Sequence, residues 1–561
     1  MQVRILYKSA AHTPRRKFLD ARRAAPRLYP VAALLAVWGL AAALPAAAFE
    51  IETDTPDLKM RWDNSFKYST ARRLKDPSAV LTGEVNQDDG DRNFDKGMIS
   101  NRVDLLSEFD IGYKNFGARV SGAAWYDDVY NKSNANNSPA TANALSTPYN
   151  QFTDAARKLH GHKAEFLDAY VFGKFDLDGR QSTVRLGKHT LIYGESLFFG
   201  GNGIAGAMAP VDAVKALSVP GSQVKEILMP VPQVSTQVQL TDELSAGAYY
   251  QFRWEATRLP AVGSYFSPLD MGGPGAERLI AGPPLMPGGG PAALFHGADA
   301  NAKNSGQGGA QLRYRPKGGD IEYGVYALQF HAKTPLVFAN PGVGVNPATG
   351  QVGTYGFVYG ENVKLYGLSA STSIGDAGVA GEVSVRRNTP LDSSGFMTPD
   401  GYTAGNSAHA QVSALYVLPK TGLWDNASIA AEVAWNRVTS ITRNADKLDP
   451  LATRDGWGYR VLFEPTYYQV LPALDLSVPI NIGYAPKGRS ALAANLGPNK
   501  GGDITIGLNG EYAKLWKFGL SYTHYFGTEA TLLNPSTGYT NNYNQAMKDR
   551  DFVSFNVQRT F

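Results

Sequence analysis

Short and long connections alternate strictly along this chain, between segments that show the periodicity of β-strands. In "LKMRWDNSFKYST", which begins at Leu58, apolar and polar side chains alternate with a period of two. Short turns are centred near residues 115, 178, 242, 317, 375, 420, 472 and 514. Long segments rich in Gly, Pro, Asn and Ser lie between them, at roughly 71–98, 131–163, 193–230, 256–308, 332–361, 388–407, 440–456, 485–502 and 527–550. Tight periplasmic turns and long outer loops alternate in this way in outer-membrane β-barrels.

The pattern predicts an all-β fold, an antiparallel up-and-down transmembrane barrel of about 18 strands, with about 16 strands as the nearest alternative. An even number of strands places both termini in the periplasm. Aromatic residues make up 11% of the chain, yet the mean hydropathy is only -0.25. This combination is typical of a barrel, because only every second residue of a strand contacts lipid.

The last residues, "DFVSFNVQRTF", also form a strand pattern. Val553, Phe555 and Val557 share one face, and Ser554 and Asn556 lie on the other. Because lipid tolerates no open sheet edge, we expect this strand to close against the first one near Leu58. A terminal aromatic, Phe561, after an alternating strand resembles the signal that the barrel-assembly machinery reads.

The first 48 residues read as a signal peptide, which leaves residues 49–561 as the barrel. A basic region precedes the apolar run 31–44, and the small residues 46–48 follow, so we expect cleavage after Ala48. A membrane anchor and a twin-arginine signal, from "PRRKFLD", are the alternatives. The whole chain has a net charge of +4, and the leader alone has +7, so the remainder has −3. The remainder therefore gives no reason to expect that the protein binds nucleic acid. The absence of Cys fits an oxidising compartment.

No motif predicts an enzyme or a cofactor. "GNGIAG" matches G-x-G-x-x-G at Gly201, Gly203 and Gly206, but Asp212 comes too early to be the acidic residue that a dinucleotide site needs about 20 residues further on. No G-x-S-x-G, H-E-x-x-H or P-loop sequence occurs. His409 and His524 fall in strand segments, so a membrane-embedded Ser-His hydrolase stays a minor alternative.

One acidic loop is a candidate cation site. In "NQDDGDRNFD", Asp89, Asp91, Asn93 and Asp95 alternate around a glycine. Oxygen-rich loops of this kind bind Ca²⁺, although the glycine is misplaced for an EF-hand. A solvated acidic loop without metal is the alternative.

The segment from Tyr193 to Val234 is too long for a plain turn and too apolar for an exposed loop. We expect residues 194–228 to fold into the lumen and constrict it, with a helix from Pro210 to Leu217; a surface lid is the alternative. Its charged residues are the candidate constriction residues: Glu195, Asp212, Lys215, Lys225 and Glu226.

Further charges fall on the predicted inward faces of strands. They are Arg102, Asp104, Glu108, Arg185, Arg253, Glu255, Arg313, Glu382, Glu432 and Glu464. Opposed charges across a pore orient polar or amphipathic solutes. The alternative is that each of them only hydrates the lumen or pairs with a neighbour.

Four stretches resemble a proteobacterial outer-membrane family labelled domain of unknown function 1302: "YGESLFFGGNGIAGAMAPVDAVKALSVPGSQVKEILMPVPQVS", "YYQFRWEATRLPAVGSYFSPLDMGG", "DDGDRNFDKGMISNRVDLLSEFD" and "VKLYGLSASTSIGDAGVAGEVSVR". Members usually have Trp at the position of Tyr193, and Glu195 is kept. The resemblance implies a barrel that handles hydrophobic compounds such as lipids, steroids or terpenoids, beside periplasmic and inner-membrane transport partners. We therefore expect a channel for a small hydrophobic or amphipathic molecule. An export or trafficking conduit acting with those partners is the main alternative, and a mainly structural barrel is another.

Overall fold

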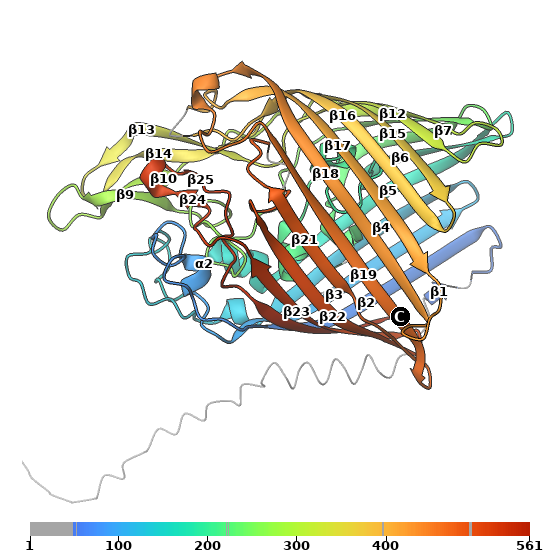
Figure 1. Ribbon diagram of the computed structural model, residues 1–561, viewed down its shortest axis with the longest axis horizontal. Coiled ribbons are helices and arrows are strands. Elements are labelled where there is room, and N and C mark those ends of the chain that lie inside the picture. The colour runs from blue at the N-terminus through green and yellow to red at the C-terminus, as the bar shows by residue number, and fades with distance from the viewer. Residues whose placement is uncertain (1–48, 52, 220–221, 223, 395–397, 493–495) are drawn as a thin grey trace, which may run out of the picture. The chain divides into compact units, whose positions relative to one another are not determined.

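The computed structural model describes residues 49–51, 53–219, 222, 224–394, 398–492 and 496–561, and the predicted signal peptide lies outside them. The described chain forms a closed antiparallel barrel of 18 strands, so the alternative of sixteen is wrong (Figure 1). The barrel strands are β2 (Leu58–Arg73), β3 (Met98–Tyr113), β4 (Phe116–Asp127), β5 (His162–Leu177), β6 (Arg180–His189), β7 (Val231–Gln239), β8 (Leu244–Gln251), β11 (Gln307–Tyr314), β12 (Glu322–Phe330), β15 (Val363–Ile374), β16 (Ala377–Pro390), β17 (Ala404–Leu418), β18 (Asn426–Arg443), β19 (Asp455–Leu471), β20 (Leu474–Ser477) with β21 (Ile480–Lys487) as one broken strand, β22 (Gly501–Tyr512), β23 (Trp516–Phe526) and β26 (Phe552–Thr560). A short strand, β1 (Phe49–Ile51), adds to β2.

The last strand closes the barrel against the first, as the alternation of its residues predicts. β26 pairs antiparallel with β2 over the register from Ser65↔Thr560 to Arg73↔Phe552. Phe561 continues this ladder, because its N–H donates to the Asn64 carbonyl at 2.9 Å and its own carbonyl accepts from the Asn64 N–H at 2.7 Å. No sheet edge is therefore left open to lipid. That the assembly machinery reads Phe561 remains a prediction.

All the predicted short turns join consecutive barrel strands at one end of the barrel, and the long connections lie at the other end (Figure 1). The turn between β5 and β6 shows the local cause. Asp178 and Gly179 have φ of 53° and 79°, and two positive φ angles are what a two-residue hairpin turn needs. Asp-Gly supplies them at little steric cost.

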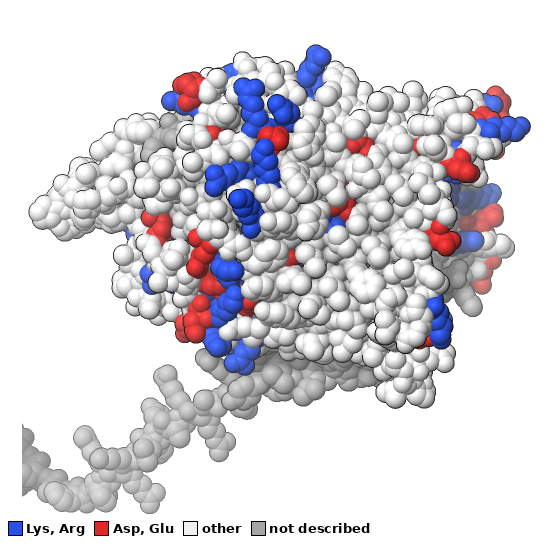
Figure 2. Space-filling model, in the orientation of Figure 1, with Lys and Arg blue, Asp and Glu red and all other residues white. Residues whose placement is uncertain are grey.

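The outer face of the barrel is apolar around its middle. Alternate strand residues such as Leu368, Val383 and Val412 point outward and are more than half exposed, at 54%, 51% and 58%. In Figure 2 the charged side chains gather over the long loops and over the short turns, with few between. This uncharged band between two charged rims matches a bilayer and its two surfaces. The protein lies in the outer membrane of a Gram-negative bacterium.

The outer loops carry the remaining elements. A separate four-stranded sheet contains β9 (Arg278–Pro284), β10 (Pro291–His296), β13 (Leu336–Asn346) and β14 (Gln351–Val358), and a small one contains β24 (Leu533–Asn534) and β25 (Thr540–Asn541). The helical turns are α2 (Asp89–Arg92), η1 (Val129–Asn131), α3 (Asp154–Ala156), η2 (Arg157–Gly161), η4 (Ala445–Lys447) and η5 (Pro535–Thr537). None of the helices in the described part of the chain has the length and apolar character that a membrane crossing requires.

Candidate functional site

The connection between β6 and β7 folds into the barrel, as predicted, and does not form a lid. We call its described residues, 194–219, 222 and 224–228, the plug. It contains η3 (Ile204–Ala207), α4 (Ala213–Ser218) and α5 (Val224–Ile227). The first part of the plug binds inward-facing side chains of β16, β17 and β18, and these five side chains form what we call the latch: Glu382, Arg386, His409, Gln411 and Glu432.

Glu432 on β18 binds the backbone of the plug directly. Its carboxylate accepts the N–H groups of Leu197 at 3.2 Å, Phe198 and Phe199 at 2.8 Å, and it also accepts from the Gln411 amide at 3.1 Å. Only 1% of Glu432 is exposed. A buried carboxylate is costly unless donors surround it, and here the plug supplies most of the donors.

Glu382 on β16 binds the plug backbone in the same way, and its position shows why glycines are needed at Gly194 and Gly203. It accepts the N–H of Glu195 at 2.7 Å and of Ile204 at 2.8 Å. A Cβ on Gly203 would lie 2.4 Å from Glu382 Oε1, and one on Gly194, which has φ of +94°, would lie 2.5 Å from Oε2. The glycines thus let the backbone approach a carboxylate of the barrel wall, as other glycine-rich loops approach a phosphate.

Asn202, the second residue of the glycine motif, is fully buried in the latch. Its Oδ1 accepts from the Asn436 amide at 3.1 Å, and His409 Nδ1 also lies 3.1 Å from this oxygen. Because an amide oxygen only accepts, His409 must donate its Nδ1–H to it. His409 Nε2 then accepts the Ser407 hydroxyl at 2.9 Å. The Ser-His pair that the minor hydrolase alternative requires is therefore present, but Ser407 is 1% exposed and the pair positions Asn202.

Arg386 completes the latch. Its Nη2 donates to the carbonyls of Gly201, Asn202 and Gly203 at 2.8–3.1 Å. The wall therefore offers carboxylates to plug N–H groups and a guanidinium to plug carbonyls, so both kinds of backbone group are satisfied without regular secondary structure.

The second part of the plug lies against the wall that contains β2, β3 and β4. Asp212 caps α4 by accepting the Lys215 N–H at 3.0 Å and pairs with Arg258 at 2.6 Å. The helix therefore begins after Asp212, and the prediction of a start at Pro210 was wrong, because the capping carboxylate sets the first turn. Lys215 lies 5.2 Å from the centre of the Trp125 ring.

The remaining plug charges pair with the wall. Lys225 forms an ion pair with Glu108, and Glu226 lies 3.8 Å from Lys67. Glu195 pairs with Arg313 of β11 at 3.0 Å.

The other predicted lumen residues divide into two groups. Arg102 is inward and buried, pairs with Asp104 at 2.6 Å and stacks on Trp125 at 4.8 Å. Arg253 and Glu255, by contrast, lie beyond the end of β8 at Gln251, where they pair with each other at 2.9 Å; the side chain of Arg253 is 65% exposed. The prediction that they lie on the inward face of a strand was wrong, because the alternation was extended past the end of β8.

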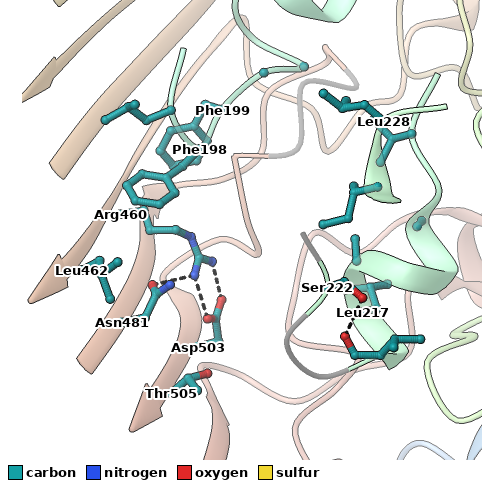
Figure 3. A pocket seen from close by; sticks show the side chains of 18 of the residues that line it. Phe198, Phe199, Leu217, Ser222, Leu228, Arg460, Leu462, Asn481, Asp503 and Thr505 are labelled. Atoms are coloured by element: carbon teal, nitrogen blue, oxygen red, sulfur yellow. Dashed lines mark hydrogen bonds and ion pairs between the residues drawn. The ribbon is translucent and has the colours of Figure 1, made fainter. Parts of the chain in front are cut away.

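A cavity of about 1870 Å³ lies between the plug and the opposite wall, made by β19–β23 and β26. Figure 3 views it between Arg460, Asn481 and Thr505 on the strands and the plug residues Leu217 and Leu228. The plug face is mostly apolar: Leu197, Phe198, Phe199, Ala205, Ala213, Leu217, Ile227 and Leu228. The strand face is mostly polar: Arg460, Glu464, Asn481, Asp503, Thr505, Asn509, Ser554, Asn556 and Gln558.

Arg460 and Asp503 carry the charge at the middle of this strand face. Arg460 Nη2 lies 2.7 Å from Asp503, and its Nη1 also donates to Asn481 at 2.9 Å. Sequence reasoning missed these residues, although a signal was present. In "DITIGLNGEY" every second residue from Asp503 onward faces inward.

The cavity extends along the barrel axis. Its lining includes Asp392 and Leu492 from the outer loops and Tyr468, Asp475 and Lys517 near the short turns. The cavity therefore reaches from one rim of the barrel towards the other beside the plug.

The acidic loop does not form the predicted cation site. Asp91 pairs with Arg73 at 3.0 Å and with Arg550 at 2.9 Å, all three fully buried. Asn93 donates to the Gly263 carbonyl at 2.8 Å, while Asp95 is exposed. The predicted set, Asp89, Asp91, Asn93 and Asp95, does not converge, because Asp91 is held by two arginines and Asp95 lies exposed beyond the end of α2.

The chain matches none of the curated proteins. A family model described as "Protein of unknown function (DUF1302)" matches residues 29–561. Among solved structures, OccAB3 of Acinetobacter baumannii is 10% identical with a TM-score of 0.41, over 90% of this chain and 99% of that one. OccK9 (OpdG) of Pseudomonas aeruginosa is 9% identical with a TM-score of 0.42, over 90% and 98%. The outer membrane channel DcaP of Acinetobacter baumannii is 9% identical with a TM-score of 0.36, over 92% and 100%. The fold assigned above rests on this chain's own strand pairing.

Proposed function

Because this chain belongs to the DUF1302 family and forms a porin-like barrel of the outer membrane, we propose that it is a channel for a small amphipathic molecule. In this proposal the plug narrows the lumen and stays latched, and the solute passes through the cavity between the plug and the wall of β19–β23 and β26. No covalent chemistry is part of the proposal. Selectivity comes from the shape and polarity of the lining.

The two unlike faces of the cavity are the observation that carries the proposal. The Phe198, Leu217 and Leu228 side chains offer apolar contact on the plug side. Arg460 and Asn481 offer charge and hydrogen bonds on the strand side. A solute with one apolar and one polar side satisfies both faces, whereas a sugar leaves the apolar face without a partner and a pure hydrocarbon leaves the polar groups desolvated.

Liposome swelling with the purified full-length barrel tests this proposal. We expect amphipathic carboxylates to enter faster than sugars of equal mass, and we expect discrete conductance steps in planar bilayers. A protein that inserts and folds but neither conducts nor admits either solute would overturn the channel proposal. It would favour the export or trafficking conduit, which needs periplasmic and inner-membrane partners to open.

A further inference from the structure

Three buried carboxylates come together in the outer loops, away from the cavity. Asp88 and Asp89 belong to the loop between β2 and β3, and Asp270 belongs to the loop between β8 and β9. One oxygen of each lies within 4.8 Å of the others. Their exposed fractions are 2%, 4% and 0%.

The hydrogen bonds around the cluster leave two of its oxygens without a donor. Asp89 is surrounded, since it accepts from Asn136 and Asn143 at 3.0 Å and from Thr141. Asp270 Oδ2 accepts the Asp89 N–H at 3.1 Å. The other oxygens, Asp88 Oδ1 and Asp270 Oδ1, are buried and have no hydrogen-bond partner. Buried carboxylate oxygens without a donor are costly, and in proteins such oxygens usually bind a donor or a cation.

The cluster also has fewer positively charged partners than carboxylates. Within the described part of the chain, the only ion pair to these three carboxylates is that of Arg92 with Asp88. A neighbouring cluster shows the contrast, because there Asp91 and Asp549 lie against Arg73 and Arg550, and the charges cancel. Three buried carboxyl groups therefore face a single guanidinium.

We propose that Asp88, Asp89 and Asp270 bind one divalent cation, Ca²⁺ or Mg²⁺, at the outer mouth of the barrel. The donors are all carboxylate oxygens, which are the ligands that these hard cations prefer over transition metals. The cation would join the β2–β3 and β8–β9 loops. Through the bonds of Asn136, Thr141 and Asn143 to Asp89 it would also fix the β4–β5 loop.

Calorimetric titration of the EDTA-treated, detergent-solubilised barrel with CaCl₂, and separately with MgCl₂, tests the proposal. We expect one saturable site for at least one of the two cations, and a higher midpoint of thermal unfolding when it is filled. Asp270→Asn should weaken binding by at least about tenfold. Asp95→Asn is the matched control, since it removes one exposed carboxylate of the same acidic region, and it should leave binding unchanged.

Heat-modifiable migration on gels establishes that each variant is folded. If Asp270→Asn does not fold, Asp88→Asn replaces it, with the same expected loss. If neither folds, the cation-dependent midpoint of the wild-type barrel decides, and its absence overturns the proposal. Wild-type protein without a saturable site overturns it too, as does a folded Asp270→Asn or Asp88→Asn variant that binds like wild type, or an Asp95→Asn variant that loses binding.

Discussion

Two walls of the same barrel use inward-facing polar residues for different purposes. On β16–β18 the inward charges Glu382, Arg386 and Glu432 are buried and bind the backbone of the plug. On β19–β22 the inward charges Arg460 and Asp503 are about a quarter exposed and line the cavity. Both walls have the same alternation in sequence. What differs is whether a plug segment covers them, and that decides whether a charge stabilises the structure or faces a solute.

Removing the plug should erase this difference and have the largest effect. Replacing residues 194–228 by a short Gly-Ser connection leaves every strand ladder in place, since barrel hydrogen bonds run between strands. We expect a folded barrel whose single-channel conductance rises several-fold and which admits larger solutes. Trimming the exposed hairpin tip at 343–348, outside the barrel, is the control and should change neither property. An unchanged conductance in the folded deletion variant would reject the constriction.

Single glutamates on the two walls should respond differently. Glu432→Ala removes the acceptor of the Leu197, Phe198 and Phe199 N–H groups, and each donor left buried costs about 1–3 kcal/mol. We expect the plug to detach, with noisy and increased conductance and new protease cleavage near Phe198. Glu464→Ala, on the neighbouring strand, removes only a bond from Ser477 and should leave the plug protected. Equal protease resistance of the two variants would show that the latch does not hold the plug.

Larger side chains should also have different effects on the two walls. Ala434 is fully buried against Phe199 and Leu496, so Ala434→Trp should overpack the latch and lower the free energy of unfolding by about 1–3 kcal/mol. Thr505 faces the cavity, so Thr505→Trp should leave stability unchanged and reduce conductance. Urea unfolding and bilayer recordings measure the two effects. If Thr505→Trp destabilises as much as Ala434→Trp, the cavity is not open at that wall.

The smallest effect should come from one charge on the cavity wall. Arg460→Ala leaves Asp503 without its guanidinium partner, so the pore should become more selective for cations while its conductance changes little. The reversal potential under a salt gradient measures this change. Asn481→Ala, the neutral neighbour, should not shift it, and an Arg460→Ala pore with wild-type selectivity would exclude Arg460 from the ion path.

Most of the barrel could be predicted from the sequence because its signals are local. Period-two alternation and turn residues such as Asp178-Gly179 depend only on neighbouring residues, so strand number and closure followed from them. The plug was also predictable, since its length and apolar content exclude an exposed loop.

The site was predictable only in part, because it depends on contacts far apart in the chain. Glu382 and Glu432 could be recognised as inward, but nothing in the strands shows that their partners lie near residue 200. Arg253 was misplaced since alternation continues past the end of β8. The acidic residue Asp270 lies about 180 positions from Asp89, so spacing could not reveal their cluster.

The central claim is that the solute passes along the wall of β19–β23 and β26 and not along the wall that binds the plug. Cysteine accessibility tests this claim most directly, because the chain contains no Cys and each engineered thiol is therefore unique. Thr505→Cys places a thiol on the cavity wall, and Ala434→Cys places one beneath the plug, where Ala434 is fully buried against Phe199 and makes no latch hydrogen bond. A charged thiol reagent is added during single-channel recording of each folded variant. We predict a stepwise fall in current for Thr505→Cys and no change for Ala434→Cys. A fall for Ala434→Cys with none for Thr505→Cys would contradict the account and place the solute path on the latched wall.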